Sequence, residues 1–184
     1  MTSSADGSAE PVAGSQLAVR AIDAARYRTV LSHYPTGVCA VTAMHEGEPT
    51  GFVVGSFTSI SLEPALAGFF PDKSSTTFPK VRAAGAFCAN VLSAEDESLC
   101  RLFAAKDADR FASIAWRAGA TGAPILDRAT AWVECEIEQV LEVGDHLLVV
   151  GRVIDLAEGS GADPLLFHRG RYGSYASTAR EMRR

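Results

Sequence analysis

The stretch WVECEIEQVLEVGDHLLVVGRVIDL, residues 132–156, decides the fold. In its first part apolar side chains alternate with glutamates, which is typical of a β-strand with one buried and one solvent-facing side. The predicted solvent-facing residues are Glu134, Glu136 and Glu138. Gly144-Asp145 then indicates a turn into a second apolar run. Because two strands joined by a tight turn must be antiparallel, the segment predicts an antiparallel sheet.

Four shorter segments upstream of this hairpin carry a similar signal. Each is apolar or rich in β-branched residues, and the expected strands are residues 37–44, 51–57, 66–70 and 86–92. Because the strands are mostly linked without crossover helices, the sheet is expected to close, or nearly close, on itself. The predicted fold is therefore mainly β, a small antiparallel β-barrel with a few short helices at its ends.

Three short helices are expected around these strands. The first begins at Asp23, whose carboxylate can cap the first turn, and is stopped by Pro35. The second covers residues 76–84, and the third begins at Ser93, where Ser-Ala-Glu-Asp resembles a capping box. Residues 1–16 are rich in Ser, Ala and Gly without periodicity, so we expect them to form a disordered tail.

The composition narrows the class of protein. The chain has 184 residues, of which 47% are hydrophobic, which is enough for one domain with a substantial core. A net charge of −5, from 17 basic and 22 acidic residues, argues against binding nucleic acid or anionic membranes through bulk charge. No apolar stretch approaches the roughly 20 residues of a membrane helix, and the first residues lack the pattern of a secretory signal. We expect a cytoplasmic domain without nucleic-acid or membrane partners.

The cysteines and histidines do not indicate a metal site. Cys39, Cys88, Cys100 and Cys135 form no C-x-x-C pair, and the four histidines have no H-E-x-x-H or comparable spacing. Three of the cysteines lie inside apolar runs, where a thiol behaves as a small hydrophobic side chain. We therefore expect reduced core cysteines and no metal ligands.

No nucleophile or nucleotide-loop motif is present. The sequence contains no G-x-S-x-G, no Walker loop and no G-x-G-x-x-G after a strand. What remains are three polar segments at the ends of predicted elements, residues 56–59, 73–77 and 168–173.

The second of these segments has a direct chemical interpretation. Its hydroxyl side chains stand immediately before a predicted helix, and Lys73 and Lys80 lie on either side of them. Free amides, hydroxyl donors and positive charge suit a phosphate group. The alternative is an ordinary capped helix start on the surface, and spacing alone leaves both interpretations open.

Taken together, these segments resemble the flavin reductase-like family, the FMN-binding split-barrel reductases that serve two-component flavin-dependent monooxygenases. The resemblance covers about residues 22 to 175. Its motifs, in chain order, are GFVVGSFTSISLEPAL, DKSST, GAFCANVLSAEDESLCRLFA, DRFA, WVECEIEQV, GDHLLVVGRV and PLLFHRGRYG.

The resemblance implies an antiparallel, Greek-key-like split β-barrel over residues 17–176, followed by a C-terminal tail at 177–184. It also implies a homodimer that uses NADH or NADPH to reduce FMN or FAD, and a partner monooxygenase that receives the reduced flavin. The sequence does not choose between the two flavins or between the two nicotinamide nucleotides.

The family's binding residues can be carried over position by position. For the flavin, the resemblance implies Val54, Gly55, Ser56, Phe57, Ser59, Ile60, Ser74, Ser75, Thr76, Lys80, Val81, Phe103, Lys106 and Asp107. For the nicotinamide it implies His168, Arg169, Gly170 and Tyr172, with His146 as a weaker candidate near the same cleft.

Little acid–base chemistry is expected of the protein itself. Hydride passes between the two cofactors, so the chain has to stack their rings in a reactive geometry. We expect His168 and Arg169 to position the nicotinamide or its phosphates. The backbone amides of residues 55–57 are expected to stabilise charge on the reduced ring. No residue is assigned as a catalytic base.

Two positions depart from the family pattern. Gly55 stands where many members carry an amide side chain, which predicts weaker retention of the flavin or room for a different substituent on its ring. Ala65 replaces a second proline after SLEP, which predicts a looser loop. Two other functions stay open at this point: a flavin carrier or sensor without reductase turnover, and a structural split barrel that has lost its flavin.

Overall fold

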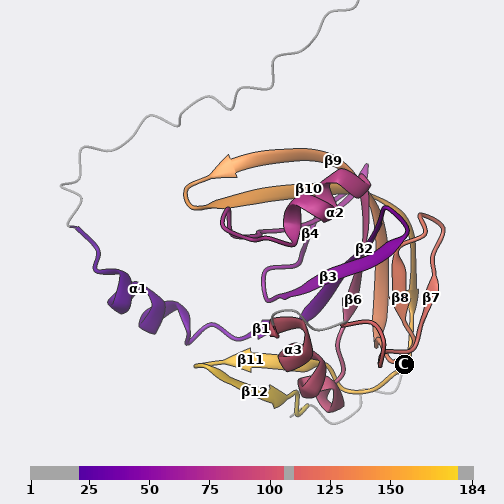
Figure 1. The fold of residues 1–184 in the computed structure, drawn as a ribbon. Helices are drawn as coiled ribbons and strands as arrows, with labels where there is room; N and C mark the ends of the chain where they lie inside the picture. Colours follow the sequence, from indigo (N-terminus) through magenta and orange to yellow (C-terminus); the bar gives the residue numbers. More distant parts are fainter. Residues whose placement is uncertain (1–20, 106–109, 178–184) are drawn as a thin grey trace, which may run out of the picture.

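The framework of the molecule is a seven-stranded antiparallel sheet with the strand order β3-β2-β6-β9-β10-β5-β4 (Figure 1). This computed structural model describes residues 21–105 and 110–177. β3 and β4 form the two edges of the sheet. Its strands are β2 (Cys39–His45), β3 (Glu48–Val54), β4 (Thr58–Leu62), β5 (Ala65–Phe69), β6 (Ala86–Val91), β9 (Ala131–Val143) and β10 (His146–Glu158).

Smaller elements complete the fold. A three-stranded sheet has the order β1-β11-β12, and β7 pairs with β8. The strands of these sheets are β1 (Thr36–Gly37), β7 (Trp116–Ala118), β8 (Pro124–Leu126), β11 (Leu165–His168) and β12 (Arg171–Ser174). The helices are α1 (Ala24–Leu31), α2 (Phe78–Ala84) and α3 (Glu97–Ala104), with one 3₁₀ turn at Ala94–Asp96.

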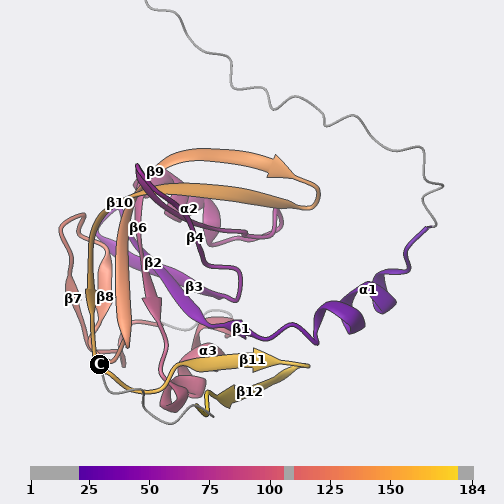
Figure 2. The ribbon, with the colours of Figure 1, turned by 180° about the vertical axis from the view of Figure 1, so that it is seen from behind.

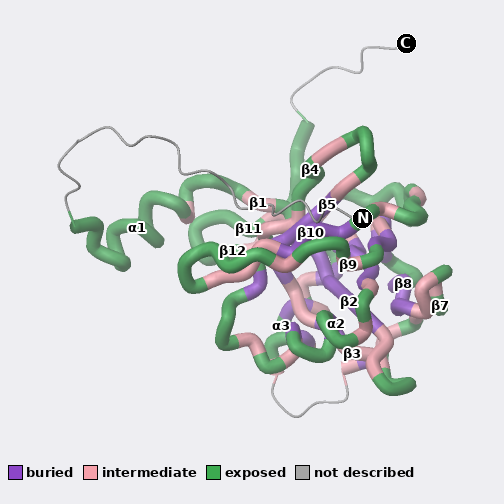
Figure 3. The backbone as a smooth tube through the Cα atoms, turned by 90° about the horizontal axis from the view of Figure 1, so that it is seen from above, coloured by how far each residue is buried: buried purple, intermediate pink, exposed green. Residues whose placement is uncertain are grey.

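Two hairpins project from the barrel in the same direction. In Figures 1 and 2 the far end of β9–β10 lies on one side of the barrel mouth and β11–β12 lies on the other, with β3 and β1 between them. α1 extends away from the barrel on that side, and all of its residues are exposed (Figure 3). A pocket lined by several candidate site residues opens between these two hairpins.

The predicted hairpin and the mainly-β class are confirmed. β9 and β10 pair antiparallel on either side of the Gly144-Asp145 turn, as the alternation and the turn signal indicate. The strands expected near residues 37–44, 66–70 and 86–92 are present as β2, β5 and β6. The strand expected at 51–57 begins and ends earlier, as β3. β4, β7, β8, β11 and β12 were not predicted, because segments of three to five residues are too short to show a period.

The caps predicted for the first and third helices are confirmed, whereas α2 begins at Phe78, two residues later than expected. The Asp23 side chain accepts a hydrogen bond of 2.8 Å from the backbone N–H of Arg26 at the start of α1. Ser93 and Asp96 form the reciprocal bonds of a capping box. α1 ends at Leu31, four residues before Pro35.

The prediction that Glu134 faces solvent is wrong. The residue is fully buried because the β7–β8 hairpin covers this half of β9. Its carboxylate accepts hydrogen bonds from the backbone N–H of Ala120 at 2.8 Å and of Thr121 at 3.1 Å, and from the Thr121 hydroxyl at 2.6 Å. A buried carboxylate is tolerated where such donors satisfy it. Glu136 and Glu138, further along the strand, are exposed as expected.

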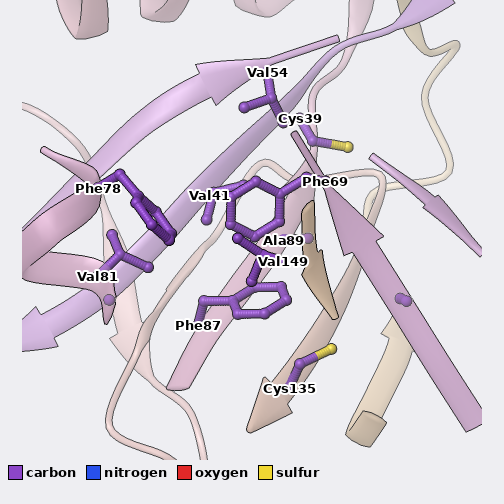
Figure 4. Close-up of a cluster of buried hydrophobic side chains, with 12 residues drawn as sticks. Cys39, Val41, Val54, Phe69, Phe78, Val81, Phe87, Ala89, Cys135 and Val149 are labelled. Carbon is purple, nitrogen blue, oxygen red and sulfur yellow. The ribbon is translucent and has the colours of Figure 1, made fainter. Parts of the chain in front are cut away.

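The main core lies inside the curved sheet (Figure 4). The Phe69 ring contacts Phe87 and Phe78 edge to face, with centroid distances of 5.0 and 6.3 Å. Phe78 and Val81 bring α2 onto the sheet. Edge-to-face pairs of this kind add about 0.5–1.5 kcal/mol to the burial of each ring. α2 and the loop before it are therefore held rigidly against the barrel.

A second core joins α3 to the β11–β12 hairpin. Leu92, Cys100, Phe103 and Leu165 are buried together in it, and Tyr172 packs against it. The backbone of Leu165 is bonded on both sides, to Val38 at 3.2 Å and to Leu92 at 2.9 Å. The base of the hairpin is thus fixed to the barrel.

Asn90 on β6 is the polar centre of the barrel and is fully buried. Its Nδ2 donates to the carbonyl oxygen of Ala40 at 3.2 Å and to the Thr42 hydroxyl at 3.1 Å. Its Oδ1 accepts from the backbone N–H of Leu126 at 2.8 Å. One side chain therefore ties β2, β6 and β8 together.

The prediction of core cysteines is confirmed, since all four are buried. Burial raises the pKa of the Cys39 and Cys135 thiols to about 12, so both are protonated at neutral pH. None of the helices in the described residues is both long and apolar enough to cross a membrane. The tails expected at 1–16 and 177–184 lie outside the described residues, apart from Ser177.

Candidate functional site

A pocket of about 530 Å³ opens where β3 ends, between the two projecting hairpins. We call it the strand-end pocket. The chain passes here from one edge strand of the sheet to the other, so residues 55–57 lie outside the sheet ladder. The lining residues are Thr36, Phe52, Val53, Val54, Gly55, Ser56, Phe70, Pro71, Asp72, Ser75, His146 and Phe167.

Ser56 fixes the shape of this pocket. Its hydroxyl accepts a hydrogen bond of 3.0 Å from the backbone N–H of Phe70 and lies 3.4 Å from the carbonyl oxygen of the same residue. The end of β3 is thereby tied to the end of β5. The Ser56 side chain therefore holds this wall of the pocket in place. The Ser56 backbone belongs to the connection between β3 and β4.

Gly55 lies close to the Thr36 side chain, which would have to shift if position 55 carried a Cβ atom. A Cβ atom at this position would lie 2.8 Å from the Oγ1 of Thr36, closer than real Cβ contacts. Thr36 belongs to β1, so the glycine lets two sheets approach each other at the pocket. This contact is a structural reason for the departure from the family pattern noted above.

The Ser74–Ser75–Thr76 segment lies beside the strand-end pocket, and several polar groups of Ser74 and Ser75 already have partners. The backbone N–H of Ser74 donates to Asp72 Oδ1 at 2.7 Å. The Ser75 hydroxyl accepts from the backbone N–H of Phe78 at 3.1 Å and so caps α2. Hydrogen bonds from Ser74, together with the charge of His146, hold the pKa of Asp72 below its ordinary value. Ser75 faces the strand-end pocket, whereas Thr76 faces its neighbour.

That neighbour is a second pocket of about 570 Å³, which we call the cationic pocket. Thr76, Thr77 and Lys80 line it from the α2 side, and Arg110 also lines it. The remaining lining residues are Glu48, Pro49, Thr50, Gly51 and Phe111. Within the described part of the chain the two pockets share no lining residue, but their linings are consecutive in sequence at Gly51–Phe52 and at Ser75–Thr76.

Arg110 was not among the site residues predicted from the sequence. Its guanidinium donates to the carbonyl oxygen of Gly51 at 3.1 Å, to the Thr77 hydroxyl at 3.4 Å and to the carbonyl oxygen of Ala105 at 3.1 Å. Within the described residues no carboxylate forms an ion pair with Arg110 or Lys80, whereas Lys73 is paired with Glu142 at 2.9 Å. The signal that could have found Arg110 is the DRFA motif that contributes to the family resemblance.

His146 lies in the strand-end pocket at the start of β10. Its Nδ1 is 2.7 Å from Asp145 Oδ1, and its backbone forms a bridge with Asp72. The hydrogen bond from His146 lowers the pKa of Asp145. Leu147 N–H also donates to the carbonyl oxygen of Pro71 at 3.0 Å, which fixes the turn against the pocket. The weaker histidine candidate is therefore placed beside Gly55 and Ser56.

The four residues expected to bind nicotinamide do not share one face. In the antiparallel register Tyr172 pairs with Phe167, whereas His168 pairs with Arg171, so the two pairs point to opposite sides of the β11–β12 hairpin. Phe167 lines the strand-end pocket. His168, Arg169, Gly173 and Arg171 line a separate pocket of about 450 Å³ with Leu166 and Tyr172. Gly170, with φ +76°, forms the turn between them.

Several other expected flavin residues lie away from both pockets. Val81 and Phe103 are buried in the two cores, and Phe57 packs against the main core. Ser59 and Ile60 are exposed on β4. Lys106 and Asp107 lie outside the described residues.

Comparisons with known proteins agree on one family. The model of the flavin reductase like domain matches residues 31–176. A flavin reductase of Pseudomonas putida is 49% identical over 158 residues, which are 85% of this chain and 93% of the relative. The reductase subunit HsaB of a flavin-dependent monooxygenase of Rhodococcus jostii is 43% identical over 156 residues, 85% of this chain and 80% of the relative.

Solved structures agree with these matches. The NADH:FAD oxidoreductase SgcE6 of Streptomyces globisporus, in complex with NAD and FAD fragments, superposes with a TM-score of 0.80 at 34% identity. That match covers 86% of this chain and 96% of the SgcE6 chain. Nitrilotriacetate monooxygenase component B of Mycobacterium thermoresistibile superposes with a TM-score of 0.80 at 37% identity, covering 85% of this chain and 90% of the other.

Proposed function

Since this chain belongs to the flavin reductase like domain family, we propose that it is an NAD(P)H:flavin oxidoreductase. It transfers a hydride from reduced nicotinamide nucleotide to FMN or FAD. The reduced flavin is supplied to a partner monooxygenase, the role that the relative HsaB is named for.

The observation that carries this proposal is the pair of adjoining pockets. A flavin nucleotide has a planar, uncharged ring at one end and a phosphate at the other. The strand-end pocket is lined mainly by apolar side chains and by backbone outside the sheet ladder, whereas the cationic pocket holds Lys80 and Arg110. The residues present therefore fit the group: the ring at residues 54–56 and the phosphate near Thr76.

When it is bound, a flavin supplies the electron-accepting ring for hydride transfer. The chain's residues hold and orient the reactants. The connection at 55–57 offers backbone N–H and C=O groups to the edge of the ring, and the Ser56–Phe70 bonds keep this connection in place. Such preorganised donors stabilise charge that gathers on the ring without rearranging during the reaction.

His146 is the side chain best placed to act on the second reactant. Its Nδ1–H is engaged by Asp145, and among the described residues Nε2 has no partner, so Nε2 of the neutral ring is left to accept a hydrogen bond from a ligand N–H in the strand-end pocket. We propose that it orients the nicotinamide amide over the ring. No proton transfer is assigned to it.

The test of this function is a two-by-two assay of NADH and NADPH against FMN and FAD. We expect loss of absorbance at about 340 nm, the band of reduced nicotinamide, with at least one combination. Flavin binding by fluorescence quenching without any nucleotide oxidation would support the flavin carrier instead. Absence of both binding and oxidation would contradict a flavin function altogether.

We further propose a cytoplasmic homodimer. Large apolar side chains stay exposed on β4 and on the far end of the β9–β10 hairpin, among them Leu62 at 86% and Val143 at 49%. A two-fold partner is the commonest way for a chain of this size to cover such surfaces. Light scattering is expected to give about twice the chain mass of 19.4 kDa, and a monomer mass at micromolar concentration would contradict this assembly.

A further inference from the structure

Phe167 is a large apolar side chain left exposed inside a pocket. It is 39% exposed, comes from the three-stranded sheet and lines the strand-end pocket. Phe70, at the end of β5, lines the same pocket and is 36% exposed. Apolar surface exposed inside a pocket is stabilised when an apolar ligand surface covers it.

Tyr172 supports Phe167 from the side that faces away from the pocket. The two residues are cross-strand partners in the β11–β12 hairpin, so they share one face. Their ring centroids are 5.2 Å apart with the planes tilted by 57°. Thr36 continues the same face on β1, because it is the register partner of Phe167. The face of the three-stranded sheet that carries Phe167 therefore continues into the strand-end pocket at Thr36.

Tyr172 is itself anchored to α3. It packs on the second core with Cys100 and Phe103. Burial, with a smaller contribution from the Cys100 contact, raises the pKa of Tyr172 to about 12, so the hydroxyl stays protonated. Tyr172 thus packs on α3 and against Phe167, although it also contributes to the lining of the pocket beside His168 and Arg169.

The backbone of Phe167 is held between β1 and β12, at Thr36 and Tyr172. The base of the hairpin is fixed by the Leu165 backbone bonds, while beyond it the backbone N–H of Arg169 donates to the carbonyl oxygen of Ser32 at 3.0 Å. Ser32 follows α1, which is exposed throughout. Of the aromatic side chains in the described residues, Tyr172 is the one whose ring contacts the Phe167 ring.

We propose that Phe167 is a contact residue for the flavin ring in the strand-end pocket, and that Tyr172 is a positioning residue that acts through Phe167. This inference rests on the proposed flavin binding and differs from the family-based expectation that Tyr172 contacts the nicotinamide.

Riboflavin binding tests the proposal, because riboflavin has the ring without a phosphate and no nicotinamide is needed. Fluorescence titration of Phe167→Ala is expected to show a Kd about tenfold higher, and Tyr172→Ala a Kd about fivefold higher, from lost aromatic contact. Tyr172→Phe keeps the packed ring and is expected to stay within about twofold of the wild type. Tyr175→Ala, a matched tyrosine exposed just beyond β12, is the control and is expected to change nothing.

The double variant Phe167→Ala/Tyr172→Ala separates the two roles. If Tyr172 acts through Phe167, the double variant binds riboflavin no more weakly than Phe167→Ala alone. The proposal would be overturned if the increases in riboflavin Kd of the two single variants multiplied in the double variant. It would also be overturned if the single variants left the riboflavin Kd unchanged and raised the KM for NAD(P)H. Wild-type riboflavin binding without nucleotide oxidation would contradict only the reductase function, since the titration involves no turnover. Thermal melting of each variant shows that the folded protein is being measured, and Phe167→Leu replaces Phe167→Ala if the latter unfolds.

Discussion

Replacing Arg110 with alanine is expected to weaken FMN binding by about 10- to 100-fold, because hydrogen bonds to charged groups contribute about 1.5–3 kcal/mol. The guanidinium is held beside the loop before α2 by the carbonyl oxygens of Gly51 and Ala105 and by the Thr77 hydroxyl. Within the described residues no carboxylate forms an ion pair with it, and it lines the cationic pocket together with Lys80 and Glu48. Fluorescence titration with FMN measures the loss, which is expected to shrink as salt is added.

The comparison with riboflavin decides whether this effect comes from the phosphate. Riboflavin binding by Arg110→Ala is expected to stay close to the wild-type value, since riboflavin carries no charge. Arg82→Ala serves as the control, because Arg82 is an exposed arginine on α2 outside both pockets. Equal losses for FMN and riboflavin would show that Arg110 only supports the fold around Gly51.

Replacing Asn90 with alanine is expected to lower the free energy of unfolding by about 3 kcal/mol, since each buried polar group left without a partner costs about 1–3 kcal/mol. The change removes the partner of the Leu126 N–H and of the Ala40 carbonyl oxygen and leaves a cavity beside them. For a chain of this length a loss of that size lowers Tm by roughly 6–12 °C. Thermal melting followed by circular dichroism measures it.

Gln139→Ala is the matched control for Asn90. Gln139 carries the same amide group on β9 but is exposed. Its removal is expected to change the unfolding free energy by no more than about 0.5 kcal/mol. If Asn90→Ala melts within a degree or two of the wild type, the buried network does not stabilise β8 on the barrel as proposed.

The elements predicted well are those with a long, regular pattern. The β9–β10 hairpin follows from alternation and a Gly-Asp turn, and α1 follows from its Asp23 cap. The prediction failed at Glu134, where an acidic residue in an alternating strand reads as solvent-facing. The covering hairpin β7–β8 lies earlier in the chain, and nothing in the strand itself indicates that it folds back over that face.

The candidate site likewise contains residues that the sequence predicted and residues that it did not. Residues 54–56, Ser75, Thr76, Lys80 and His146 were expected from motifs, and each lines one of the two adjoining pockets. Arg110 and Phe167 were not expected: Arg110 belongs to the DRFA motif, but that motif does not by itself show which residues the arginine contacts, and a phenylalanine in a short strand carries no local signal. Their importance depends on Gly51, Thr77 and Tyr172, each far away in sequence or on another strand.

The sequence by itself determined the mainly-β class, the antiparallel hairpin, the helix caps and the family, because each depends on residues close together in the chain or in a fixed order. Only the tertiary structure decided which side chains meet. The register of β11–β12 sends Tyr172 and His168 to opposite faces, and the passage from β3 to β4 across the open edges of the sheet creates the strand-end pocket. Both follow from pairings between distant segments, and a side chain's face in a strand reverses with a shift of one residue in register.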